Sequence, residues 1–138
     1  MIKPIASFFL AALLGIVLHA QAQDAQEYPT KPVKIIVSFT AGGTTDIIAR
    51  SVGLNLSEKL KQPFVIENKP GASGSIGAQF VARAAPDGKT LLVGSVSEIG
   101  INPGLYPKLP YNVDRDFVAV TALAAAPMVL VAHPSSAV

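Results

Sequence analysis

The sequence contains no cysteine and no tryptophan, only two histidines among 138 residues, and few charged side chains, at 14%. The absence of cysteine excludes a disulfide framework, a thiolate metal site and a thiol nucleophile. His133 is the one histidine outside the apolar N-terminal segment, which disfavours a catalytic triad and a histidine-rich metal site. Because half of the residues are hydrophobic, the low charge does not indicate an intrinsically disordered chain.

No charge of one sign dominates the chain. The chain has eleven Lys and Arg residues and nine Asp and Glu residues, which gives a formal net charge of +2. The basic residues are spread along the sequence. Nucleic-acid-binding proteins usually cluster their basic residues, so we expect no nucleic-acid partner.

Residues 1–22 have the pattern of a secretory signal peptide. Lys3 gives a short positive region, residues 5–18 are apolar apart from Ser7 and Gly15, and Ala20-Gln21-Ala22 offers small residues at a cleavage site. At about 1.5 Å per residue the apolar run spans roughly 21 Å, which is short of the roughly 30 Å hydrocarbon core of a membrane. We therefore predict cleavage after Ala22 and a soluble product in a bacterial periplasm.

The rest of the chain alternates strand and helix patterns separated by glycine-rich loops. The predicted elements are a strand at 33–39, a helix capped by Thr44 or Thr45 and ending before Pro63, a strand at 64–67, a helix at 75–85 and a strand at 90–94. Ile48, Val52, Leu56 and Leu60 form the apolar stripe of the first helix, and the second presents Ile76, Phe80 and Val81. This order predicts an α/β fold with a mostly parallel βαβαβ sheet.

The pattern is looser beyond Gly94. Residues 95–112 are rich in Gly and Pro and are predicted to wrap the surface, and 117–123 and 128–132 are two further strand candidates.

Two loops have the composition of anion-binding cradles. In a parallel α/β sheet, ligands bind beyond the carboxyl ends of the strands, where helix N-termini converge. Residues 39–46 combine Gly42 and Gly43 with the hydroxyls of Thr44 and Thr45, and residues 68–77 combine small residues with serine hydroxyls. The alternative for each loop is a tight strand–helix turn without a ligand. We expect Asp46 to orient its loop rather than touch the ligand, because its charge would lie near a bound anion.

Other chemistries match the sequence less well. A dinucleotide fingerprint fails because Ala72 stands at a glycine position, and the segment around Ser95 is not a nucleophile elbow. Asp114 and Asp116 flank Arg115, which is typical of a solvated turn with local ion pairing. The residues thus indicate no catalytic site, no metal site and no cofactor.

A series of short motifs resembles one known family. In chain order the motifs are Tyr28-Pro29, Pro32-Val33, Phe39 to Ile47, Glu67 to Gly74, Ile76-Gly77, Pro86 to Leu92, Ile101-Asn102-Pro103, Leu105-Tyr106, Leu109-Pro110-Tyr111 and Asp116-Phe117. Their order and spacing are similar to the Bug family, the TctC-like periplasmic receptors of tripartite tricarboxylate transporters. One departure is Thr40-Ala41, where many members carry proline.

The resemblance implies a non-enzymatic receptor with a two-lobed fold of the type II periplasmic binding protein kind, which closes on a small organic carboxylate. It also implies that backbone amides and hydroxyls of the first lobe hold the carboxylate. The residues that match are Thr40, Ala41, Gly42, Gly43, Thr44, Thr45 and Asp46 in one loop, Gly71, Ala72, Ser73 and Gly74 in the next, and Ser95, Val96 and Ser97 after the third strand.

The same resemblance suggests how the chain is divided. Residues 23–127 are expected to form the first lobe, residues 128–138 to begin the crossover to a second lobe, and the chain to be a truncated form of the receptor. The expected partners are a carboxylate ligand and membrane transporter subunits, with the chain itself a monomer. A secreted α/β enzyme fragment and a stand-alone interaction module remain the alternatives.

Overall fold

The computed structural model describes residues 28–127 and 129–136. Its contacts divide the chain into Met1–Thr30 and Lys31–Val138, and every helix and strand named below lies in the second unit. The predicted signal peptide, residues 1–22, lies outside the described residues, as do Met128, Ala137 and Val138.

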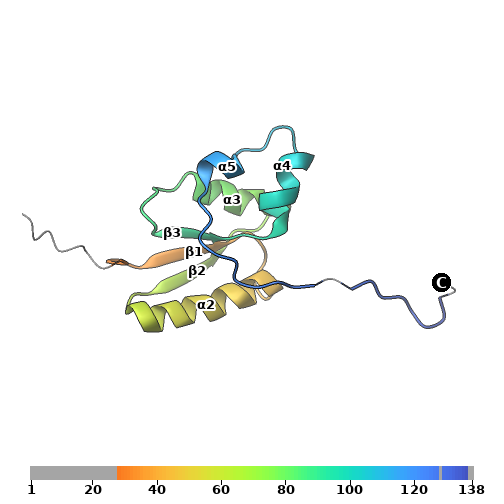
Figure 1. Ribbon diagram of the computed structural model, residues 1–138, viewed down its shortest axis with the longest axis horizontal. Helices are drawn as coiled ribbons and strands as arrows, with labels where there is room; N and C mark the ends of the chain where they lie inside the picture. The colour runs from red at the N-terminus through yellow and green to blue at the C-terminus, as the bar shows by residue number, and fades with distance from the viewer. Residues whose placement is uncertain (1–27, 128, 137–138) are drawn as a thin grey trace, which may run out of the picture. The chain divides into compact units, whose positions relative to one another are not determined.

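A three-stranded parallel sheet forms the centre of this unit (Figure 1). Strand β1 (Val33–Val37) lies between β2 (Phe64–Asn68) and β3 (Thr90–Val93). Val37 is in register with Asn68 on one side and with Val93 on the other, so the three strands end at one edge. The predicted parallel α/β fold class is confirmed.

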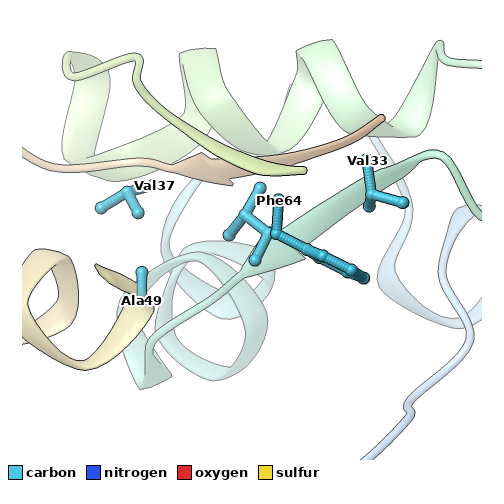
Figure 2. Packing of buried hydrophobic residues seen from close by; sticks show 5 residues of the cluster. Val33, Val37, Ala49 and Phe64 are labelled. Carbon is cyan, nitrogen blue, oxygen red and sulfur yellow. The ribbon is translucent and has the colours of Figure 1, made fainter. Parts of the chain in front are cut away.

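Two helices cover opposite faces of the sheet (Figure 1). Helix α2 (Thr44–Leu60) packs on β1 and β2, and α3 (Ser75–Ala82) packs on β3 and β1. Because side chains alternate along a strand, Val33, Ile35 and Val37 face α2, whereas Ser38 faces α3. The α2 side holds the apolar cluster, in which Val33 and Val37 pack with Ala49 and Phe64 (Figure 2).

Small residues, rather than the predicted apolar stripe, make the closest contact between α2 and the sheet. Ala49 and Gly53 are buried, whereas Ile48, Val52 and Leu56 are half-buried and Leu60 is exposed. A Cβ atom on Gly53 would lie 2.8 Å from Ile66 Cδ1, so the helix backbone approaches the sheet closely there.

Helix α3 departs further from its prediction. It ends at Ala82 rather than at 85, and Ile76 and Phe80 of the predicted apolar side are exposed. Gly77 and Ala78 face inward instead, and a Cβ on Gly77 would lie only 2.9 Å from Ser38 Cα. The prediction of the buried side was wrong because close backbone packing selects small residues.

The segment after β3 lies mostly at the surface, as predicted, but it is helical in part and contains a few buried residues. It contains a π-helical turn, η3 (Ser97–Ile101), then α4 (Asn102–Leu105) and α5 (Val113–Asp116). Glu98 and Asn102 are almost fully buried, at 0% and 1% exposure. Arg115 pairs with Asp116 at 2.6 Å, which confirms the expected local pairing.

The two strands predicted near the end of the chain were wrong. Residues 117–127 and 129–132 carry no strand, and most of their large apolar side chains are exposed. An isolated extended segment leaves its amides and carbonyls without ladder partners, and no described strand runs beside it. None of the described helices has the length and apolar character to cross a membrane.

Candidate functional site

The three predicted loops lie at the same edge of the sheet. Each follows the carboxyl end of a strand: residues 38–43 follow β1, residues 69–74 follow β2 and residues 94–97 follow β3. The Lys69 amide donates to the Val37 carbonyl at 2.8 Å, which joins the first two loops. Glu98 lies against Gly74 and so joins the second loop to the third.

The first loop ends at the start of α2. Gly42 takes a positive φ of 85°, and Gly43 is the residue that precedes the helix. The first intrahelical bond runs from the Ile47 amide to the Gly43 carbonyl at 3.0 Å, so the preceding amides of Thr44, Thr45 and Asp46 have no intrahelical acceptor. The predicted threonine cap was wrong: no side chain caps the helix from the Gly43 position.

Asp46 organises this loop, as the sequence suggested. Its carboxylate is buried and accepts from the Gly42 amide and from Arg50 Nε, each at 2.9 Å. Asn68 Nδ2 donates to the same carboxylate at 2.9 Å and to the Phe39 carbonyl at 3.0 Å. These bonds tie the first loop to α2 and to the end of β2, and both carboxylate oxygens of Asp46 accept from protein groups.

The hydrogen bonds of Asp46 also control its charge. The Arg50 guanidinium, followed by the Gly42 amide and Asn68, holds the pKa of the Asp46 carboxyl well below its usual range. Asp46 in turn raises the pKa of Arg50. The pair is therefore ionised at neutral pH, and Arg50 offsets the negative charge of Asp46 at the start of α2.

The second loop is a left-handed turn. Gly71, Ala72, Ser73 and Gly74 all have positive φ, from 48° to 125°. The Gly74 amide closes the turn onto the Gly71 carbonyl at 3.0 Å. Gly71, Ala72 and Ser73 are exposed, and α3 starts directly after the turn at the buried Ser75.

The third loop is hydrogen-bonded to the buried Glu98. Ser95 Oγ donates to Glu98 Oε2 at 2.5 Å and accepts from the Ser97 amide at 3.2 Å. The Ser95 hydroxyl hydrogen is thus committed within the protein, while the Val96 side chain is exposed. Within the described residues, Glu98 Oε1 and the buried Ser38 Oγ have no hydrogen-bond partner.

An open hollow of about 320 Å³ lies beside the second loop. Ala72, Ser75 and Ile76 form part of its lining, together with Tyr106 and Leu109 from the segment around α4. Ser73 Oγ and the Tyr106 hydroxyl are 3.3 Å apart next to it.

Taken together, the loops offer neutral hydrogen-bond donors. These are the first amides of α2, the threonine hydroxyls of the first loop and the exposed amides of the second, and they suit an anion such as a carboxylate. Among the residues that the structure describes, no group of three His, Cys, Asp or Glu side chains is placed to hold a metal ion.

Sequence reasoning missed four polar residues that support these loops. Arg50 and Asn68 bind Asp46, Asn102 binds the second loop, and Glu98 binds Ser95. Ser95 and Glu98 have the Ser-x-x-Glu spacing typical of a helix start, which could have indicated the helix after β3. Asp46 and Arg50 have the i,i+4 spacing of a helical ion pair, which could have indicated Arg50. Asn68 and Asn102 bond to residues 22 to 29 positions away, so no local pattern marks them.

The fold and this edge define an open parallel α/β unit of the class that binds ligands beyond its strand ends. A family model described as "Tripartite tricarboxylate transporter family receptor", TctC, matches residues 48–138. The chain therefore belongs to the TctC family, which confirms the resemblance seen in the sequence.

Curated relatives are considerably longer than this chain. A UPF0065 protein of Bordetella pertussis is 39% identical over 132 residues, which are 96% of this chain and 41% of that protein. Protein BugT of the same organism is 39% identical over 130 residues, 91% of this chain and 40% of its own. The chain thus spans about two fifths of the length of these relatives.

Solved structures agree with the fold. MatC from Rhodopseudomonas palustris with bound malate is 44% identical, has a TM-score of 0.66, and is matched over 70% of this chain and 33% of its own. R. palustris Rpa4515 with adipate is 40% identical, has a TM-score of 0.62, and is matched over 64% of this chain and 29% of its own.

Proposed function

We propose that the chain binds a small organic carboxylate at the carboxyl edge of its sheet, as the first lobe of a solute receptor for a tripartite tricarboxylate-type transporter. The observation that carries the proposal is the convergence of three loops and the start of α2 at one edge, where the amides of Thr44, Thr45 and Asp46 have no intrahelical acceptor. MatC with malate and Rpa4515 with adipate, both of this fold, support a dicarboxylate as the ligand class.

Each loop has a different part in this proposal. Thr40, Ala41, Gly43, Thr44 and Thr45 would contact the carboxylate through amides and hydroxyls, while Gly42, whose amide is donated to Asp46, shapes the loop that Asp46 holds. Gly71, Ala72 and Ser73 would contribute amides of the left-handed turn, which the Gly74 amide closes onto the Gly71 carbonyl. Ser95 and Val96 would contribute amides and Ser97 its hydroxyl, because the Ser95 hydroxyl hydrogen is already donated to Glu98 and the Ser97 amide to Ser95 Oγ.

Binding by these loops alone should be weak. Association costs an estimated 4–15 kcal/mol, whereas a hydrogen bond to a charged group contributes about 1.5–3 kcal/mol. A few such bonds leave millimolar affinity, which is about −4 kcal/mol.

Nuclear magnetic resonance titration tests the proposal at this affinity. The ¹⁵N-labelled chain, expressed from its full coding sequence, is titrated with malate, with adipate and with the cation cadaverine as a control. We expect both dicarboxylates to shift the amides of the three loops, and neither to shift Lys61 and Gln62 near the opposite edge. Unchanged loop amides at saturating millimolar concentrations would overturn the proposal.

A matched pair of variants assigns the site. Thr45→Val removes a hydroxyl at the start of α2, and Thr121→Val removes an exposed hydroxyl outside the three loops. We expect the first to weaken malate binding severalfold and the second to leave it unchanged. If the two variants bound malate with equal affinity, Thr45 would not be part of the binding site.

We also propose that the chain acts in the periplasm as a monomer and is cleaved after Ala22. N-terminal sequencing of the exported protein tests the cleavage site, and light scattering tests the oligomeric state. A product that begins at Met1 would contradict the first, and a dimer the second.

A further inference from the structure

The second loop holds a backbone conformation that two of its residues disfavour. Ala72 and Ser73 have φ of 48° and 51°, in the left-handed region where a Cβ atom crowds the following carbonyl. Glycine occupies the other two positions of the turn, at Gly71 and Gly74, without that penalty. Two adjacent non-glycine residues in this region persist only where their surroundings hold them.

Asn102 supplies a long-range contact to the backbone of this turn. It is the first residue of α4, its side chain is 1% exposed, and Nδ2 donates to the Ser73 carbonyl at 2.9 Å. Nδ2 also donates to Ser75 Oγ at 3.1 Å, on the other side of Gly74. One side-chain amide thus connects the left-handed residue to the first residue of α3.

Asn102 is itself held from a third segment. The Tyr111 hydroxyl lies 3.5 Å from Asn102 Nδ2 and donates to the Glu98 carbonyl at 2.7 Å. Tyr111 is buried, and its ring meets Phe117 edge-on at 5.8 Å. The Asn102 amide therefore also contacts a segment outside the second loop, the one around Tyr111.

The chemistry of the contact requires an amide. Three oxygens face Nδ2 and act as acceptors, those of the Ser73 carbonyl, the Ser75 hydroxyl and, at the longest distance, the Tyr111 hydroxyl, and a side-chain amide provides two donors. Aspartate has the same shape but offers only acceptors when ionised, so it would repel the Ser73 carbonyl.

We propose that Asn102 is a positioning residue that keeps residues 71–74 in the left-handed turn. The effect of Asn102 on ligand binding rests on the proposed function, in which the exposed amides of the turn contact the carboxylate. Asn102 touches no ligand and acts through the conformation of Ala72 and Ser73.

Chemical shifts test the proposal directly. The ¹³Cα and ¹³Cβ shifts of Ala72 and Ser73 report a left-handed backbone, and they are compared in the wild-type chain and in Asn102→Asp. We expect both residues to leave the left-handed values, and the affinity for malate to fall roughly threefold to tenfold. The matched control is Asn55→Asp on the exposed face of α2, where neither quantity should change.

A rescue experiment separates positioning from packing. Asn102→Ala is combined with Ala72→Gly, because glycine takes a positive φ without a Cβ penalty. We expect the double variant to recover part of the malate affinity that Asn102→Ala loses. An equal loss with and without Ala72→Gly would indicate that Asn102 only fills space, and would overturn the proposal.

Two further outcomes remain decisive. If the Asn102 variants do not fold, Tyr111→Phe is measured instead, because it removes only the hydroxyl beside Asn102. Altered chemical shifts of Ala72 and Ser73 in this variant would support the proposal, and unchanged shifts would overturn it. If the wild-type chain binds no dicarboxylate, the proposed function fails, while the shifts of Ala72 and Ser73 still decide whether Asn102 holds the turn.

Discussion

The loops on the two faces of the sheet are held in place by different interactions. On the α2 face, the first loop is fixed by ionised groups: Asp46 pairs with Arg50 at 2.9 Å, above an aliphatic cluster that includes Ile35 and Ala49. On the α3 face, the second loop is fixed by the neutral amide of Asn102 and by the close approach of Gly77 to Ser38.

This difference shows how one strand can position two loops independently. Val33, Ile35 and Val37 of β1 face α2, and by the same alternation the small Ser38, directly after the strand, faces α3. The α2 face can respond to acid through Asp46, whereas the Asn102 contact includes no carboxylate. Variants that remove one support at a time should therefore separate the two faces.

Gly77→Ala should have the largest effect on stability. A Cβ at this position would lie 2.6 Å from Ser38 Oγ and 2.9 Å from Ser38 Cα, and the backbone atom cannot move aside cheaply. We expect a loss of about 1–3 kcal/mol in the free energy of unfolding, measured by urea denaturation.

Gly104→Ala is the matched control for that substitution, because a Cβ there meets nothing within 4 Å. We expect it to be neutral or slightly stabilising. If Gly77→Ala were as well tolerated as Gly104→Ala, the close approach of α3 to β1 would not be a feature of the protein in solution.

Asp46→Asn should have the next largest effect, and it should depend on pH. The folded-state pKa of Asp46 is depressed, so its contribution is present above the unfolded pKa of about 4 and is lost as pH falls below it. We expect the melting temperature of the wild type to fall more steeply than that of Asp46→Asn between about pH 4 and pH 2.

Two further variants show whether the acid sensitivity is specific to Asp46. Asn102→Ala should keep the acid dependence of the wild type, because the Asn102 side chain bonds to no carboxylate. Asp116→Asn removes a half-buried carboxyl whose pKa the Arg115 guanidinium lowers to about 2, and it should flatten the curve less than Asp46→Asn. If the melting temperatures of the wild type and Asp46→Asn fell in parallel as the pH is lowered, the two faces of the sheet would not differ in their response to acid.

Gly53→Ala tests close packing on the α2 face and should have a smaller effect than Gly77→Ala. Its new Cβ would meet the flexible end of Ile66, at 2.8 Å from Cδ1, rather than a backbone atom. The gain in helix propensity, about 1 kcal/mol, offsets part of that crowding. We expect a net change within about 1 kcal/mol by thermal unfolding, and a stabilising effect of Gly53→Ala when Ile66→Val provides space.

The sequence was sufficient to predict elements defined by local patterns. The strands around Ile35, Ile66 and Leu91, the end of α2 before Pro63 and the glycine-rich loops all follow from periodicity and turn residues. The parallel sheet then followed from the alternation of strands and helices, and with it the gathering of the loops at one edge.

The sequence was not sufficient where tertiary contacts decide. The inward side of α3 was missed because Gly77 is selected by Ser38, which lies 39 positions earlier in the chain. The strand propensity of residues 117–123 was misleading because a strand forms only beside a partner. Asn102 gave no signal of its role because its acceptors, Ser73 and Ser75, lie almost 30 residues away.

Ser38→Ala should have the smallest effect and gives the sharpest view of the α3 face. The Ser38 hydroxyl is buried without a partner among the described residues, so its removal sacrifices no hydrogen bond there. We expect the free energy of unfolding to change by less than about 0.5 kcal/mol. In the Gly77→Ala background, Ser38→Ala should restore part of the lost stability, because it removes the clash with the hydroxyl at 2.6 Å but leaves the clash with the Ser38 backbone at 2.9 Å. A marked loss from Ser38→Ala alone would show that the hydroxyl has a bonding partner in solution, and the α3 face would then depend on more than backbone packing and Asn102.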